Sequence, residues 1–413
     1  MRDHRRNPDK TPTAKVAPYA FFFLLGIVVA LLAQKWMPFS PRQHPNGSPP
    51  AATNNLQTSS GPWGTIEYKK IPLEDSEDVF LDSAERLRKP KWSFAKFSQQ
   101  QVADLFQSAD LTAEQKAGLL DTNRWEISTN GCFVIPADEI VLRMSQGSRQ
   151  QIYSALSRCA GNYNQTYPFR FPPGGFTERF AICGLPSEKI EFIRSLTYTN
   201  FGMRCFCDFQ PVQRQFSTNE FQTLIKTLYA VPTVRMRLRV TPESNVDALL
   251  NYWGKGGRAK QLRPLFESLA RVPGGDIISV SYLLPTFARL RLYTFPDVEA
   301  DPTVAKEDCF FTALNFFNEQ PDAHFLDSKN TRKALQSEYS LTQDAPVFGD
   351  LIALANNAGD AVHICVYIAD NVVFTKNGAN YLQPWVLMKI SDMLAYFPSE
   401  EPLRMVTFRR KEL

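Results

Sequence analysis

The chain has 413 residues, which is enough for two or three folded domains with a substantial core. Its formal net charge is +4, and 21% of its residues are charged and 44% hydrophobic, as in an ordinary globular protein. The 46 basic residues are nearly matched by 42 acidic ones and are spread along the chain, so we expect no nucleic-acid partner.

The N-terminus predicts a membrane anchor. Residues 1–16 are rich in Arg and Lys, an uncharged apolar run extends from Ala17 to Ala33, and Trp36 follows where an interface anchor belongs. The run is short for a membrane span but long for the core of a signal peptide, and it ends without a good cleavage site. We therefore expect a cytoplasmic tail (1–16), a transmembrane signal anchor (17–37) and an extracytoplasmic, periplasmic location for the rest of a single-pass membrane protein.

The remainder of the chain predicts an α+β fold behind a tether. Residues 38–64 are rich in Pro, Ser, Asn and Gly and offer little to bury, which is typical of a disordered linker. Two α+β domains of unknown role are expected at 65–200 and 201–296, and a third domain at 297–413. Capping boxes, each predicting the start of a helix, begin at Ser98, Thr112 and Ser217.

Two short segments alternate apolar residues with arginine, which predicts half-buried strands at Val234–Val240 and Ala288–Leu292. Their arginines fit a solvated sheet face, and the functional alternative is an anion-binding face for a glycan, a phosphate or an acidic peptide. The glycine-rich run Gly254–Arg258 follows a predicted helix and lacks the Gly-Lys-Ser/Thr ending of a phosphate-binding loop, so we interpret it as a helix–helix turn.

The stretch from Asp308 to Asn377 carries the residues that predict chemistry. Asp308 is a suitable helix N-cap, which would place Cys309 in the first turn, where free backbone N–H groups stabilise a thiolate. His363 begins a β-branched run that ends in turn residues, which predicts a hairpin. Taken singly, a cysteine such as Cys309 is more often a small buried core residue, and a histidine such as His363 is more often a satisfied core or surface residue. Together, a cysteine at a helix start and a histidine base indicate a nucleophile.

These segments resemble the NlpC-type cell-wall peptidases, which are papain-like cysteine hydrolases. The resemblance rests on Asp308-Cys309, Gly349-Asp350-Leu351 and His363 with Val366-Tyr367. It implies a helix packed on an antiparallel sheet, with a third polar residue on the strand after the histidine. That residue is Thr375 by spacing or Asn377 two residues on, and alternation puts both on one strand face. The small Ser-Gly pair that usually follows the cysteine is Phe310-Phe311 here.

The resemblance implies a membrane-anchored extracytoplasmic cysteine hydrolase, an amidase or endopeptidase with peptidoglycan peptides as its partner. Cys309 would attack the amide carbonyl, His363 would take and return the proton, and Asn377 or Thr375 would hold the imidazole. One alternative is a papain-like acyl hydrolase or transferase acting on lipids. The other is a catalytically inactive envelope-binding scaffold.

The predicted topology places all seven cysteines outside the cytoplasm, where disulfides persist. Their odd number leaves at least one free, and Cys309 is the natural candidate. Cys205 and Cys207 are too closely spaced for a zinc pair, so we expect no metal and no cofactor. The sequence leaves the disulfide pairing and the oligomeric state open.

Overall fold

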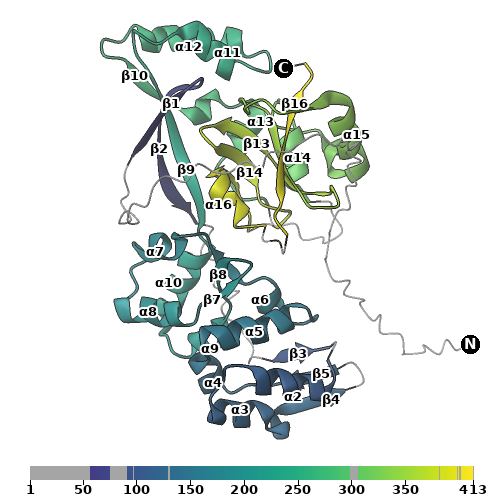
Figure 1. Cartoon of the computed structure of the whole chain (residues 1–413). Coiled ribbons are helices and arrows are strands. Elements are labelled where there is room, and N and C mark those ends of the chain that lie inside the picture. The colour runs from purple at the N-terminus through teal and green to yellow at the C-terminus, as the bar shows by residue number, and fades with distance from the viewer. Residues whose placement is uncertain are drawn as a thin grey trace, which may run out of the picture.

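The molecule has two parts, joined by the long paired strands β2 and β9 (Figure 1). One part contains the two larger sheets, and the other is mostly helical. All strand pairs among the described residues are antiparallel. This computed structural model describes residues 56–74, 91–95, 97–128, 131–297, 306–380, 382–397, 399 and 401–412.

The predicted fold class is wrong in its transmembrane part. No helix among the described residues is long and apolar enough to cross a membrane, so these residues form an α+β fold without a spanning helix. The predicted tail (1–16) and anchor (17–37) lie outside the described residues. Within the predicted linker (38–64), the structure places strand β1 (Gln57–Gly61), which is almost entirely exposed. Composition gave no sign of this strand, because it forms by pairing at a sheet edge and buries little.

A four-stranded sheet, ordered β1-β2-β9-β10, links the two parts. The predicted strand in β9 is confirmed, with its apolar residues buried and its arginines at least partly exposed. The second predicted arginine strand is wrong, because Thr286–Arg291 forms a helix in which the Arg289 N–H donates to the Pro285 carbonyl over 2.8 Å. The elements of this region are β2 (Gly64–Leu73), β9 (Val231–Val240), α11 (Val246–Trp253), α12 (Ala259–Ala270), β10 (Asp276–Ser279), η2 (Val280–Leu283) and α13 (Thr286–Arg291).

A six-stranded sheet, ordered β11-β16-β12-β13-β14-β15, forms the C-terminal region, with α14 packed on β13 and β14 (Figure 1). The predicted hairpin is β13–β14, and its turn residues Asp370 and Asn371 have φ of 45° and 58°, as a tight hairpin requires. The elements are α14 (Cys309–Leu314), η3 (Ala323–Leu326), α15 (Ser328–Glu338), β11 (Tyr339–Thr342), β12 (Leu351–Ala355), β13 (Ala361–Ala369), β14 (Val372–Lys376), β15 (Trp385–Lys389), α16 (Ile390–Leu394) and β16 (Arg404–Arg410).

Each face of the six-stranded sheet is covered by a different apolar core. The first core lies under α14 and continues into the four-stranded sheet through α11, α12 and α13. The second lies on the opposite face, under α16 and the segment that contains Phe397. Because side chains alternate along a strand, neighbouring residues of β13 enter different cores. This alternation decides where the predicted site residues point.

The mostly helical part contains two three-stranded sheets, ordered β3-β5-β4 and β6-β8-β7. All three predicted capping boxes are confirmed. The predicted boundary between residues 200 and 201 falls in the turn of the β7–β8 hairpin. The elements are β3 (Trp92–Phe94), α2 (Gln99–Ser108), α3 (Ala113–Leu120), η1 (Thr122–Arg124), β4 (Trp125–Ser128), β5 (Gly131–Val134), α4 (Asp138–Arg143), α5 (Gln146–Ser157), α6 (Tyr163–Thr166), β6 (Phe169–Phe171), α7 (Gly175–Phe180), α8 (Ser187–Ser195), β7 (Tyr198–Asn200), β8 (Met203–Phe206), α9 (Phe209–Gln213) and α10 (Thr218–Tyr229).

Candidate functional site

Cys309 is the first residue of α14, as the sequence predicts. The carboxylate of Asp308 caps the helix by accepting a hydrogen bond from the Phe311 N–H over 2.9 Å. All six residues of the helix are buried, because one side packs on the sheet and the other meets the neighbouring helices. Cys309 is therefore buried in the first core, with 6% of its surface exposed.

The surroundings of Cys309 disfavour a thiolate. Burial raises the pKa of the thiol well above its usual value, and the charge of Asp308 raises it further. The backbone N–H of Ile364 and the ammonium of Lys376 lower the pKa, but they do not offset the burial. All seven cysteines are free thiols, so Cys309 is not distinguished from the others by being unpaired.

The cation that acts on Cys309 is a lysine that sequence reasoning missed. Lys376 is fully buried at the end of β14, and its ammonium donates hydrogen bonds to the carbonyls of Gly378 (2.7 Å) and Asn380 (3.1 Å). Burial lowers the pKa of Lys376 to about 8, against the opposing effect of the negative charge of Asp308. Strand alternation is the sequence signal that could have found Lys376. It places Lys376 on the face of β14 opposite its neighbour Thr375.

His363 forms a hydrogen-bonded chain with both predicted orienting residues. Its Nε2 lies 3.0 Å from the hydroxyl of Thr375, and that hydroxyl donates to Oδ1 of Asn377 over 3.1 Å. Because the Thr375 proton is given to Asn377, Nε2 must carry the ring hydrogen and Nδ1 must be an acceptor. Nδ1 has no partner among the described residues. Of the two predicted candidates, Thr375 contacts the ring and Asn377 contacts Thr375.

The imidazole is also removed from water. His363 is fully buried and stacks on Phe397, with ring centroids 4.2 Å apart. Burial lowers the pKa of His363 to about 3, because the charged ring would lose its hydration without gaining a counter-charge. The ring is therefore neutral at physiological pH.

The structure places Cys309 and His363 on opposite faces of the sheet. Ile364 and Val366 of β13 lie in the same core as Cys309. Cys365 lies in the core on the other face, and His363 stacks on Phe397, which packs against that second core. The pairing register of β13 shifts beside His363, between Leu354 and Ala355 of β12. The sheet thus separates the predicted nucleophile from its predicted base.

The segment Gly349-Asp350-Leu351 has a structural role in this fold. Gly349 has a φ of 89°, and a Cβ there would lie 2.5 Å from the Phe317 ring. The Asp350 carboxylate accepts hydrogen bonds from Val347 N (2.9 Å) and from Nε (3.0 Å) and Nη2 (2.8 Å) of Arg409. These bonds join the start of β12 to β16, which accounts for the glycine and the aspartate without any role in catalysis.

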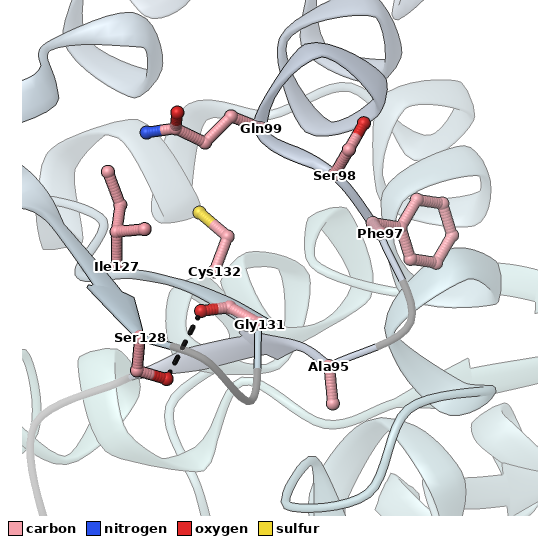
Figure 2. Close-up of a pocket in the computed structure, with 8 residues that line it drawn as sticks. All are labelled: Ala95, Phe97, Ser98, Gln99, Ile127, Ser128, Gly131 and Cys132. Carbon is pink, nitrogen blue, oxygen red and sulfur yellow. Dashed lines mark hydrogen bonds between the residues drawn. The ribbon is translucent and has the colours of Figure 1, made fainter.

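Two pockets lie elsewhere in the molecule. One, of about 530 Å³, opens beside the β3-β5-β4 sheet, where Gln99, Ile127 and Cys132 point toward one another (Figure 2). The other, of about 500 Å³, lies beside α12 and α13. Neither is lined by Cys309 or His363. In the part of the chain that the structure describes, no cluster of three or more His, Cys, Asp or Glu side chains could hold a metal ion.

No protein-family model, curated protein or solved structure matches this chain. The resemblance to NlpC-type peptidases therefore stays a prediction that rests on the short segments quoted above.

Proposed function

We propose that this chain is a non-catalytic binding and scaffold protein, in which α14 and the six-stranded sheet form a structural core. The observation that carries the proposal is the placement of Cys309 and His363 on opposite faces of β13. A thiol hydrolase needs its base within hydrogen-bonding reach of the sulfur, directly or through one water molecule. A sheet between the two groups prevents that proton transfer.

The protonation states support the same proposal. An activated cysteine has a lowered thiol pKa and a base that titrates near neutral pH. Here burial raises the pKa of Cys309 and lowers the pKa of His363 to about 3. The pair therefore remains a neutral thiol and a neutral imidazole, and neither group is prepared for acyl transfer.

One observation favours the hydrolase as a second candidate. His363 donates its Nε2 hydrogen to the Thr375 hydroxyl, and Nδ1 remains free to accept a proton, as a general base must. To reach Cys309, however, the ring would have to change strand face. A one-residue register slip of β13 would do this, but it would also exchange the side chains of the two cores.

Peptide-resolved alkylation of the full-length chain with iodoacetamide tests the proposal. Cys183 is partly exposed and serves as the internal reference. Between pH 6 and 8, Cys309 should react more slowly than Cys183, and His363→Ala should not slow it further. Faster labelling of Cys309 that is lost in His363→Ala would establish the hydrolase instead.

A further inference from the structure

A pocket of about 500 Å³ lies where α12, β10, η2 and α13 meet, outside the six-stranded sheet. Its lining divides into two kinds of surface. Arg258 and Arg289 supply two guanidinium groups. Leu262, Leu265, Ile278 and Tyr282 supply apolar surface, and Tyr282 is 63% exposed at the side of the pocket. A cavity of this size suits a small molecule rather than a folded partner.

Arg258 is held rigidly in this pocket by backbone carbonyls. Its guanidinium donates to the carbonyls of Leu283 (2.6 Å), Trp253 (2.6 Å) and Lys255 (3.2 Å). Each of the three guanidinium nitrogens donates one of these hydrogen bonds. Nη1 and Nη2 each keep a second N–H group that has no hydrogen-bond partner among the described residues. The group is thus oriented before any ligand arrives, which reduces the entropy lost on binding.

The Arg258 guanidinium lies over the Phe348 ring, 5.5 Å from its centroid, but no negative charge in the pocket balances the two arginines. Among the described residues, no carboxylate lies within 4 Å of Arg258 or Arg289. Burial, and then the nearby charge of Arg289, lower the pKa of Arg258 to about 10. Arg258 also precedes the first turn of α12, whose free N–H groups add positive potential. An anion placed between the two arginines would relieve their repulsion.

We propose that this pocket binds a small amphipathic anion, with a carboxylate or phosphate held between Arg258 and Arg289 and an alkyl or aromatic group on Leu262, Leu265 and Ile278. Arginine suits either headgroup, because its planar donors can hold two oxygens at once. The proposal stands whether or not Cys309 is reactive, since neither Cys309 nor His363 lines the pocket.

The folding of α13 explains why sequence reasoning missed this site. A strand at Ala288–Leu292 would have spread its arginines along a sheet face, as the anion-binding alternative assumed. The helix instead turns Arg289 toward Arg258 of the loop between α11 and α12. Two features that were considered separately in the sequence thus meet in one pocket.

Titration calorimetry of the full-length chain tests the proposal with eight-carbon ligands below their micelle concentrations. Octyl phosphate and octanoate should bind. Octanol, octyltrimethylammonium and inorganic phosphate should each bind at least tenfold more weakly, because each lacks one of the two features or carries the opposite charge. The affinity for octyl phosphate should fall as salt is added.

Arg289→Gln should weaken octyl phosphate binding roughly tenfold or more, since a hydrogen bond to a charged group is lost. Arg289 is exposed and makes no side-chain bond among the described residues, so this variant should fold. Arg263→Gln, on α12 but outside the pocket, is the control and should leave the affinity unchanged. Equal binding of octanol, an unaffected Arg289→Gln, or binding only to phosphatidylglycerol vesicles would overturn the proposal.

Discussion

The Nε2 of His363 on β13 and the hydroxyl of Thr375 on β14 lie 3.0 Å apart, and both side chains are fully buried. Removing the hydroxyl would leave the ring N–H and the Asn377 carbonyl oxygen without partners in an apolar core. We therefore expect Thr375→Val to lower the free energy of unfolding by about 1–3 kcal/mol in urea titrations. Thr375→Ser keeps the hydroxyl and should lose about half as much or less.

Burial of His363 predicts a pH dependence of stability. The pKa of the folded ring is lowered to about 3 from 6.5, so below pH 6.5 the unfolded chain binds a proton that the folded chain excludes. The contribution of the neutral His363 ring to the free energy of unfolding is therefore complete above pH 6.5. It is lost as the pH falls toward 3, by up to about 1.4 kcal/mol per pH unit.

The contribution of His363 is measured as a difference between variants. Denaturant titrations from pH 7.5 to 4.5 should show a shallower loss of stability in His363→Gln than in the wild-type chain. His324→Gln is the control for replacing a histidine, because the His324 side chain is largely exposed. Parallel curves for the wild type and His363→Gln would contradict the buried neutral ring.

A buried ion pair holds the helical part together. Arg149 and Asp208 meet at 2.9 Å, and their side chains are 0% and 3% exposed. The Tyr153 hydroxyl donates to the same carboxylate over 2.5 Å. Arg149→Met should cost about 3–5 kcal/mol of stability, because the carboxylate stays buried without its counter-charge.

The double variant Arg149→Met with Asp208→Leu should recover part of that loss, since no unpaired charge is then left in the core. An exposed pair is the control: Arg263→Ala, which breaks the contact with Asp247, should cost less than about 1 kcal/mol. If the double variant were no more stable than Arg149→Met, the loss would come from packing rather than from the unpaired charge.

Two glycines with positive φ offer a matched comparison of crowding. Gly349 (φ 89°) faces the Phe317 ring, where a Cβ would lie 2.5 Å away, whereas a Cβ at Gly378 (φ 99°) would meet nothing within 4 Å. Both alanine variants should lose about 1 kcal/mol to backbone strain. Gly349→Ala should lose about 1–3 kcal/mol more, because the ring must move. Equal losses of stability in the two variants, measured by thermal unfolding, would show that the Phe317 ring moves aside without an energetic penalty.

Local sequence signals predicted the elements whose cause is itself local. The Asp308 cap and the Asp370–Asn371 turn depend on a few neighbouring residues, and both are confirmed. The run Ala288–Leu292 was misleading, because five alternating residues are too few to distinguish a strand from a helix. In the helix that forms, Leu290 is left 66% exposed, so the apolar residues do not define one buried face.

The face to which His363 points could not be read from its position in the chain. From His363 to Val366, β13 alternates regularly, so His363 and Cys365 face the second core while Ile364 and Val366 face the core that contains Cys309. Which of these two faces α14 covers is set by contacts distant in sequence. Sequence order could therefore bring Cys309 and His363 into one motif without bringing them into contact.

Nitrogen-15 NMR of the histidine rings tests the separation of Cys309 from His363 most directly. The account predicts that His363 shows the neutral Nε2–H tautomer from pH 7.5 down to pH 5, with the same ring shifts in Cys309→Ser. A charged imidazolium at pH 7.5 that becomes neutral in Cys309→Ser would show that sulfur and ring share a proton, and would contradict the account.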